Sequence, residues 1–591
     1  MRDRAIRIGN FSGYLGDRFS ALDEVLSGDP VDVLQGDYLA EVTLAGLATS
    51  FKNEPERGGY VGYFLRQLKP NLEAIACRGI KVISNAGGFA PERMAKAVRV
   101  MVAEAGLSLR VAYVEGDNLL GRLTEFSALG MAMENIDTGA PLKAWGHEPI
   151  AANAYLGGFG IAEALRGGAD IVITGRVTDA SLTVGPVIWW HDWNPDNWDA
   201  LAGAITAGHV IECGAHATGG NFSGFLAVPG MACPGFPIAE VAADGSSIIT
   251  KHAGHGGAVT VDTVTAQLVY EIQGPKYLNP DATVHLDTVQ LTEVGPDRVA
   301  IGPVTGSPPP PTAKVAMFAQ IGYEISTMLF CTSPHVAEKT ALLREQLGRQ
   351  LDGVVDELDV TALGTAAVDP ASQWAATVPI RVIATGRRPE QLQGFPAAVT
   401  SLYLQGFPGF HHDGHAPQAR TPWPRIEYWP ALLPAEVVQH RAVLADGTAL
   451  LAPLPSRWAT PEETAQGSHP EPELTQPTIG PHTRTELGSF AFARAGDKGG
   501  NSNIGLWVPD PDHWEWLRTT LSTEGLLKLM PEAKDCQVIR HEFPNLRAVH
   551  FVLKGLLGTG GSANLRVDQI GKSIGEFLRS KHVTAPGAHA G

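Results

Sequence analysis

At 591 residues the chain is too long to bury a single hydrophobic core, so two or three domains are expected. Hydrophobic residues make up 44% of the sequence and charged residues 18%, a composition that excludes general disorder. The formal net charge of −17 argues against nucleic acid as a partner, because binding to a phosphate backbone requires concentrated Lys and Arg.

Cysteine usage and hydropathy predict the compartment. The 5 cysteines are widely spaced and form no CxxC pair, which indicates a reducing compartment and excludes a cysteine-only zinc site. The first residues enter a strand without an apolar leader, and no stretch reaches the ~20 apolar residues of a membrane span. We therefore predict a cytoplasmic protein that does not bind membranes.

The first 180 residues alternate short apolar runs with helical periods, which is typical of βαβ units and a parallel sheet. The predicted strands are residues 5–8, 31–34, 80–83, 110–114 and 170–173. A helix is expected from His147 to Leu165, with Pro149 in its first turn and Gly167-Gly168 after its end. Thr178 or Asp179 is expected to cap the following helix.

Each predicted strand is followed by a polar, glycine-containing loop. Loops after parallel strands share one edge of the sheet, where ligands bind in open α/β folds. Polar loops are common in such proteins, but five together favour a site. The expected cleft is lined by Asn10, Asp17, Arg18, Asp37, Asn85, Glu115, Asp117, Arg176 and Asp179.

Two of these loops suggest specific chemistry. The backbone N–H groups around Gly87 and Gly88 are candidates for holding a carboxylate or phosphate, with a plain tight turn as the alternative. Gly175-Arg176 places a fork of N–H donors beside the carboxylate of Asp179, which is a candidate base. The alternative is that Arg176 simply pairs with Asp179 or another acid.

Three further sequence patterns have possible chemical roles. The loop with Gly219, Gly220 and Asn221 is a candidate substrate-binding segment, and Cys213 near His216 suggests a thiolate nucleophile, although a buried structural cysteine is commoner. His411, His412, Asp413 and His415 have spacing compatible with a metal, but such histidines more often form a solvated surface, and no metal is predicted. Without GxSxG or HExxH, a serine hydrolase or zincin is disfavoured.

The rest of the chain predicts a division into domains. Residues 1–453 are assigned to one α/β domain with an antiparallel β-rich section at about 238–330, followed by a strand near 314, a helix over 333–351 and a strand over 379–386. A Pro- and Glu-rich linker is expected over 454–484. The pattern of strands and helices over residues 485–582 predicts a small α+β domain of ferredoxin-like character.

The predicted C-terminal domain carries two glycine-rich loops. The expected elements are strands at 490–500, 503–508, 535–542 and 548–553 and helices at 514–529 and 568–580. The first loop holds Asp497, Lys498 and Asn501, and it lies near the second, over 558–564, if the first and fourth strands are neighbours. The two loops then form a small anion-binding nest. Hairpin geometry alone is the alternative.

Several segments in this order resemble the acyclic terpene utilisation protein A family. They are IGNFSGYLGDR, SNAGGFAP, EPIAANAYLGGFGIAEALRGGADIVITGRVTDASL, ECGAHATGGNF, YEIQGPKYLNPD and AGDKGGNSNIGLWV. The resemblance runs almost the full length and implies a large N-terminal domain followed by a small ferredoxin-like domain. It also implies a place among enzymes that degrade citronellol and geraniol through branched acyl-CoA intermediates, while leaving the reaction and the catalytic residues open.

We therefore predict a catabolic enzyme that acts on a branched or terpenoid-derived acyl-CoA or organic acid, with lyase or hydratase chemistry. Asp179, Glu115 and Asp117 are the acid–base candidates, and Arg176 with the amides at Gly87 and Gly88 would hold the anion. No cofactor is required, and a coenzyme A thioester is the expected kind of substrate. A hydrolase or transferase is the nearest alternative.

The expected partners are a small acyl substrate, further copies of the chain and other enzymes of the same pathway. The rival hypothesis is a non-catalytic subunit that binds the metabolite or scaffolds a multienzyme complex.

Overall fold

The computed structural model describes residues 4–56, 58–412, 421–467, 469–472 and 482–586. Its contacts divide the chain into two compact units, one made of Met1–Phe318 with Tyr428–Gly591 and the other of Ala319–Glu427. The sequence analysis placed all of residues 1–453 in one domain, so the separate packing of 319–427 is a feature that hydrophobic patterning did not reveal. The strands β14 (Thr312–Thr332) and β18 (Trp423–Pro434) belong to both units.

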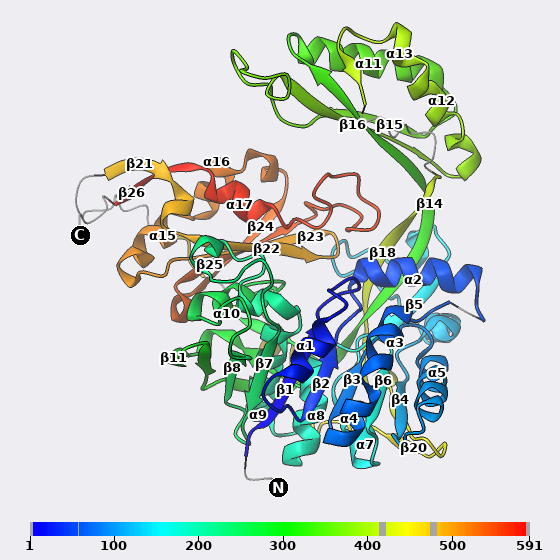
Figure 1. Ribbon diagram of the computed structural model, residues 1–591, viewed down its shortest axis with the longest axis vertical. Coiled ribbons are helices and arrows are strands. Elements are labelled where there is room, and N and C mark those ends of the chain that lie inside the picture. The colour runs from blue at the N-terminus through cyan, green and yellow to red at the C-terminus, as the bar shows by residue number, and fades with distance from the viewer. Residues whose placement is uncertain (1–3, 57, 413–420, 468, 473–481, 587–591) are drawn as a thin grey trace. The chain divides into compact units, whose positions relative to one another are not determined.

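The centre of the first unit is a parallel sheet (Figure 1). Its strands, in spatial order, are β1 (Ile6–Ser12), β2 (Val33–Gly36), β3 (Lys81–Ser84), β6 (Ile171–Thr174) and β4 (Val111–Glu115). These are the five predicted strands, and the α/β fold class is confirmed. Most of their residues are buried, as expected of short apolar strands that are covered on both faces.

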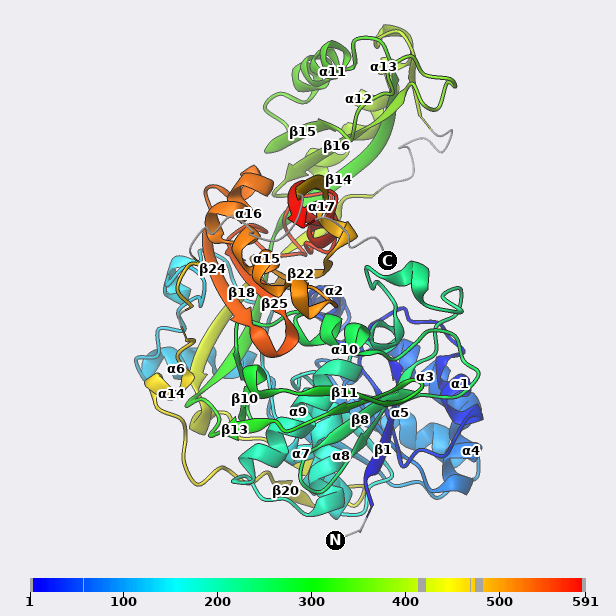
Figure 2. The ribbon, with the colours of Figure 1, turned by 90° about the vertical axis from the view of Figure 1, so that its left-hand side faces the viewer.

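Antiparallel strands extend this sheet on both sides (Figure 2). Beyond β1 lie β7 (Pro237–Val241), β8 (Ser247–Lys251), β12 (Arg298–Ile301) and β11 (Leu291–Gly295). Beyond β4 lie β19 (Arg441–Val443) and β20 (Ala449–Leu451). Part of the predicted antiparallel section therefore continues the parallel sheet, whereas β9 (Lys276–Leu278), β10 (Thr283–His285) and β13 (Thr305–Ser307) form a separate three-stranded sheet.

Helices cover the sheet. They include α1 (Ala21–Ser27), α2 (Glu41–Asn53), α3 (Gly62–Leu68), α4 (Leu72–Arg78), α5 (Pro91–Glu104), α6 (Leu123–Ala128), α7 (Phe159–Arg166), α8 (Ser181–His191), α9 (Trp198–Ile211) and α10 (Val261–Leu268). The helices α7, α8 and α9 pack side by side and contact strands from β4 across to β8. Among the residues described, no helix is both long enough and apolar enough to span a lipid bilayer.

The predicted helix from His147 is wrong in its first half. Residues Ala151–Ala154 form strand β5, which pairs with β14, and the helix α7 begins only at Phe159. Hydrogen bonds to a strand some 160 residues away override the local helical pattern, as burial in a sheet often does. The predicted cap is also wrong, because the N-cap residue of α8 is Ala180 and no side chain caps the helix.

The second unit is an antiparallel sheet with helices. The strands β15 (Glu357–Ala362), β16 (Thr377–Gly386) and β17 (Phe410–His411) join β14, and the helices are α11 (Val336–Leu351), α12 (Phe395–Thr400) and α13 (Leu402–Gln405). Leu343 and Leu347 of α11 pack with Val382 and Phe395 in a core of their own. This separate core explains why the unit is compact by itself.

The C-terminal domain is an antiparallel sheet of β22 (Phe492–Lys498), β23 (Asn501–Trp507), β25 (Ala548–Lys554) and β24 (Gln537–Phe543), in that order. A second, two-stranded sheet pairs β21 (His482–Glu486) with β26 (His582–Pro586). The helices α15 (Trp514–Thr520), α16 (Thr523–Leu529) and α17 (Ile574–Arg579) share a core with one face of the larger sheet (Figure 1). This domain confirms the predicted α+β unit.

Three details of this domain and of the segment before it differ from prediction. The expected helix over 514–529 is two helices, because the Ser522 hydroxyl caps α16 by accepting a hydrogen bond from the Gly525 N–H. The expected helix over 568–580 is only α17. In the predicted linker, α14 (Pro461–Thr464) forms, and the Gln466 amide donates to the Lys276 carbonyl at 2.6 Å.

Two buried histidines make the C-terminal domain sensitive to acid. His541 and His550 lie opposite each other on β24 and β25, with ring centroids 6.2 Å apart. Burial, together with the neighbouring histidine charges, lowers the pKa of His541 to about 4 and of His550 to about 3, so both are neutral in the folded state at pH 7. The unfolded chain, with ordinary histidine pKa values, takes up protons below about pH 6.5 and is thereby favoured.

We therefore expect stability to fall as the pH drops from about 6.5 towards 4, with each histidine contributing about 3 kcal/mol of the loss at about pH 4.5. Urea unfolding of wild type and His550→Phe at pH 7 and pH 4.5 measures this. The variant should lose less stability on acidification than wild type. His285→Gln, which removes a histidine that contacts Ser307 outside this domain, should show the full loss. Equal acid losses in His550→Phe and wild type would contradict the assignment.

Candidate active site

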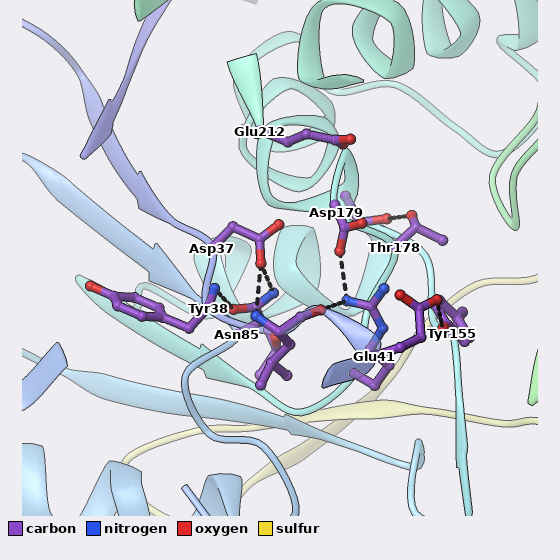
Figure 3. Close-up of polar contacts among 12 residues, drawn as sticks. Asp37, Tyr38, Glu41, Asn85, Tyr155, Thr178, Asp179 and Glu212 are labelled. Carbon is purple, nitrogen blue, oxygen red and sulfur yellow. Dashed lines mark hydrogen bonds and ion pairs between the residues drawn. The ribbon is translucent and has the colours of Figure 1, made fainter. Parts of the chain in front are cut away.

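The loops after the parallel strands bring several predicted residues together. Asp37 follows β2 and Asn85 follows β3, and the Asn85 Nδ2 donates to the Asp37 Oδ1 at 2.6 Å (Figure 3). The Asn85 Oδ1 accepts a hydrogen bond from the Tyr38 N–H at 2.8 Å, so the amide orientation is set by both of its ends. Asn85 therefore holds the Asp37 carboxyl in place.

The charged side chains gathered beside these loops are called the charged cluster below. Arg176 is its most buried cation, with 2% of its side chain exposed. Its Nη1 donates to the Asp179 Oδ1 at 2.6 Å and to the Leu39 carbonyl at 2.7 Å. Its Nε is buried and has no hydrogen-bond partner among the residues described. The pairing with Asp179 is the alternative that the sequence analysis left open, and the remaining N–H is the kind of donor that an anionic ligand would satisfy.

Asp117 follows β4 and holds the backbone of the Arg176 loop. Its Oδ2 accepts from the Arg176 N–H at 2.7 Å and from the Asn153 Nδ2 at 2.8 Å. A Cβ at Gly175 would lie 2.3 Å from this oxygen, so only glycine allows the close approach. Burial raises the pKa of Asp117 to about 6, against the hydrogen bonds that it accepts. These contacts give Asp117 a positioning role.

The carboxyl groups of Asp37, Asp179 and Glu212 lie near one another beside these loops (Figure 3). Burial and then the charge of Asp179 raise the pKa of Asp37 well above its ordinary value, although Arg176 and Asn85 oppose the shift. Burial also raises the pKa of Glu212, whose Oε1 lies 3.3 Å from the His209 Nδ1. Carboxyl groups with a raised pKa beside a carboxylate that is paired with a cation are typical of acid–base sites.

A second group of side chains adjoins Arg176. The Tyr155 hydroxyl donates to the Glu41 Oε1 at 2.8 Å (Figure 3). The Lys314 Nζ lies 3.7 Å from the same oxygen. The Arg176 guanidinium carbon lies 4.2 Å from the centroid of the Tyr155 ring. Burial acts to raise the pKa of Glu41, but the charges of Lys314, Lys498 and Arg176 outweigh it and lower that pKa.

The C-terminal domain contributes cations to the same cluster. The Lys498 Nζ lies 3.1 Å from the Glu271 Oε2, and the Lys572 Nζ lies 3.7 Å from the Glu271 Oε1. Burial acts to lower the pKa of Lys498, but Glu271, Glu41 and other acids raise it overall. Lys498 of the C-terminal domain therefore remains charged beside acids of the N-terminal domain.

The comparisons with known proteins agree with this two-part layout. A family model described as acyclic terpene utilisation family protein AtuA matches residues 6–444. The chain belongs to this family. A second model, the AtuA ferredoxin-like domain, matches residues 485–584. No curated protein and no solved structure shows significant similarity to the chain.

Some predicted residues of this AtuA-family chain lie away from the cluster. The Glu115 carboxylate pairs with Arg441 of β19 at 2.6 Å. Arg18 pairs with Glu24 at 2.5 Å, and Asp17 accepts from the Gly13 N–H at 2.6 Å. The Asn10 Nδ2 donates to the backbone carbonyl of Glu212 at 3.2 Å, so Asn10 holds the backbone at Glu212 in place.

Several predicted glycine segments serve packing and turns in the AtuA fold. A Cβ at Gly87 would lie 2.5 Å from the Thr174 carbonyl oxygen, and the Gly88 N–H donates within its own turn to the Asn85 carbonyl at 3.1 Å. The Gly219-Gly220-Asn221 loop docks the C-terminal domain, because the Asn221 carbonyl accepts from the Arg494 Nη1 at 3.1 Å. The Gly87-Gly88 segment therefore has the geometry of the tight turn that was its alternative, and the Gly219-Gly220-Asn221 loop contacts the C-terminal domain.

The other two candidates for chemistry were the Cys213 thiol and the histidine-rich segment near His411. Burial raises the pKa of the Cys213 thiol well above its ordinary value, which disfavours a thiolate. His411 and His412 are described, whereas Asp413 and His415 lie outside the described residues. Within the described part of the AtuA chain, no group of three or more His, Cys, Asp or Glu side chains is arranged to hold a metal ion.

The predicted nest in the C-terminal domain has a different geometry. β22 and β25, the predicted first and fourth strands, are separated by β23, yet the two loops meet, since the Leu557 N–H donates to the Gly500 carbonyl at 2.9 Å. The Asn501 Nδ2 donates to the Asp137 Oδ1 at 2.6 Å and so docks the domain. Asp497 and Lys498, in contrast, face the charged cluster.

Sequence reasoning missed half of this AtuA cluster. Glu41, Tyr155, Glu212, Glu271, Lys314 and Lys572 were not singled out. Glu41 is the first residue of α2 and reads as an ordinary acid in a first helical turn. Tyr155 lies inside the segment that was assigned to a helix. The local signals were three quoted motifs that contain Tyr155, Glu212 and Glu271, but these motifs were used only for the resemblance.

Proposed function

We propose that this AtuA-family chain is a catabolic enzyme with acid–base chemistry of the lyase or hydratase type, acting on a branched or terpenoid-derived acyl-CoA or organic acid. The observation that carries the proposal is the pair of Asp37 and Asp179 beside the buried Arg176. A carboxyl group with a raised pKa, beside a carboxylate that is paired with a cation, is a usual means of moving protons in acid–base catalysis.

Each member of this group has a role in the proposed reaction. Asp179 acts as the base that removes a proton next to the substrate carbonyl. Asp37, whose pKa is raised by burial and by the charge of Asp179, is the member of the pair that binds a proton more readily than an ordinary Asp. The unpartnered Arg176 Nε holds the enolate or carboxylate oxygen as charge develops there. Asp117 and Asn85 keep the loops in position.

An apolar feature supports an acyl substrate. Tyr155, whose hydroxyl contacts Glu41, also lines a mainly apolar cavity of about 60 Å³. Leu156, Phe159 and Val438 line the same cavity. A cavity of this size holds a few water molecules or part of an alkyl chain. An alkyl chain fits the apolar lining better, because apolar cavities are poorly hydrated.

The test incubates the purified full-length chain with a panel of branched enoyl-CoA and hydroxyacyl-CoA esters and the matching free acids, followed by mass spectrometry. We expect gain or loss of water, or cleavage of a carbon–carbon bond, for at least one ester, and no conversion with Arg176→Met. Arg166→Met is the matched control, since Arg166 pairs with Glu163 and Asp192 on the surface. Binding without turnover, also with pathway enzymes present, would instead support a non-catalytic subunit.

A further inference from the structure

A cavity of about 310 Å³ lies between the C-terminal domain and the helix α10, away from the charged cluster. Both views place α10 against the C-terminal sheet (Figures 1 and 2). Asp262 and Thr265 of α10 line one side of the cavity, and Trp507, Asn545 and Arg547 of the C-terminal domain line the other. A volume of this size is typical of sites for small molecules.

The α10 side of the cavity offers a carboxylate and a hydroxyl. The Asp262 Oδ1 accepts from the Trp507 Nε1 at 2.9 Å, while its Oδ2 accepts no hydrogen bond from any residue described. Thr265 follows one helical turn later, on the same face, and its side chain is buried. No described residue bonds the Thr265 hydroxyl. Two polar groups of α10 therefore remain available to a ligand in the cavity.

The C-terminal side offers a cation and an amide oxygen. The Arg547 Nε donates to the Val508 carbonyl at 3.1 Å, whereas its two Nη groups have no hydrogen-bond partner in the described part of the chain. The Asn545 Nδ2 donates to two backbone carbonyls, those of Leu286 at 3.0 Å and Val289 at 2.9 Å. Its Oδ1 is buried and unpartnered among the described residues. Buried polar atoms without a partner are rare in folded proteins.

The two opposite charges of the cavity act on each other without touching. The charge of Arg547 favours the ionised form of Asp262, but no ion pair within 4.0 Å joins them in the residues described. Burial and the nearby charge of Glu293 oppose this effect and raise the pKa of Asp262 overall. A ligand that is only an anion would meet the repulsion of both acids, and one that is only a cation would meet Arg547. A ligand with both charges satisfies both walls.

We propose that this cavity binds a small zwitterion, an α-amino acid with an uncharged apolar side chain. The ligand's carboxylate accepts from the Arg547 Nη groups, a geometry that suits the fork of a guanidinium. Its ammonium group donates to the free Asp262 Oδ2 and to the Thr265 hydroxyl. Leu291 and Leu546, which line the same cavity, provide apolar contacts for the side chain of the ligand.

This site is independent of the proposed reaction. Trp507 pairs with Phe492 at the open end of the β22–β23 hairpin, whereas Lys498 pairs with Asn501 at its turn, beside the charged cluster. The ligand therefore takes no part in acid–base chemistry there. Because it would contact α10 and the C-terminal domain together, its binding should stabilise the docking of that domain and raise the melting temperature of the full chain.

The test uses isothermal titration calorimetry on the full-length chain with three matched probes. They are L-leucine, 4-methylpentanoate, which lacks the ammonium group, and 3-methylbutylamine, which lacks the carboxylate. We expect L-leucine to bind and to raise the melting temperature. Each truncated probe should bind at least about tenfold more weakly, because it loses one charge-assisted contact. No binding of L-leucine, or equal affinity for L-leucine and either truncated probe, would overturn the proposal.

Two variants locate the binding. Asp262→Asn keeps an acceptor for the Trp507 Nε1 and removes only the charge, and Arg547→Gln removes the guanidinium. Each should weaken L-leucine binding by at least about tenfold, with circular dichroism confirming that the variant is folded. Arg566→Gln is the matched control, since Arg566 of the same domain pairs with Glu532 at 3.2 Å. It should bind L-leucine as wild type does. Unchanged L-leucine affinity in folded Asp262→Asn would contradict this site.

Discussion

Arg176→Met is expected to abolish turnover and to lower the free energy of unfolding by about 3–5 kcal/mol. The variant keeps most of the side-chain volume but removes the charge that faces Asp179 and Glu41. It also leaves the Leu39 carbonyl without its donor. Breaking a buried ion pair is costly because the remaining carboxylate stays desolvated without a partner. Urea unfolding and the ester assay measure the two effects on the same preparation.

Arg166→Met separates this effect from the general loss of an arginine. Arg166 pairs with Glu163 at 2.7 Å and with Asp192 at 3.2 Å, and 29% of its side chain is exposed. Surface pairs of this kind contribute about 0–1 kcal/mol. The control should therefore keep its activity and most of its stability. Similar stability losses in both variants would contradict a special role for the buried guanidinium.

Asp179→Asn is expected to lower kcat/KM by about 10²–10⁴-fold, the usual contribution of a general base. Asp37→Asn should lower it by only about tenfold, a loss of about one hydrogen bond. The difference follows from the protonation state, because Asn resembles the neutral carboxyl of Asp37 but cannot replace a carboxylate that accepts a proton. Steady-state kinetics with one ester decides between them. Equal losses in the two variants would contradict the division of roles.

The stability of the Asp37→Asn variant gives an independent check on the raised pKa of Asp37. A carboxyl whose pKa is raised on folding binds its proton more tightly in the folded state, so the folded state is penalised as the pH rises above the unfolded value of about 3.9. Asp37→Asn removes this penalty and should unfold at a higher urea concentration than wild type at pH 8. Asp170→Asn, which breaks a pair with Lys81 at the opposite end of the same strands, should be destabilised.

Much of the N-terminal sheet could be predicted because its strands are short, apolar and rich in branched residues. Residues 171–173 have this pattern, and the parallel order then places Asp37, Asn85 and Arg176 at one edge. The helix predicted from His147 failed for the opposite reason. Residues 151–154 form a strand only because β14 is available to pair with them, and no local pattern reports a partner that distant.

The charged cluster shows the same difference between local patterns, which could be predicted, and contacts between distant residues, which could not. Asp179 and Arg176 were found because they lie three residues apart in one loop. Glu41, Lys314 and Glu271 come from distant parts of the chain and act on the site through charge, which depends on distance in space and on burial. Glu115 also follows a strand of the same sheet, but its carboxylate pairs with Arg441 of the adjacent strand β19.

By itself, the sequence determined the class of fold, the positions of the five parallel strands, the small C-terminal domain and the family. These features depend on local hydrophobic period and on motifs, which a linear chain displays directly. Only the tertiary structure decided which acids have a raised pKa, which glycines serve packing, and that Lys498 of the C-terminal domain lies beside Glu271 of the N-terminal domain. Proton affinity is set by desolvation and neighbouring charge, and both exist only after the chain has folded.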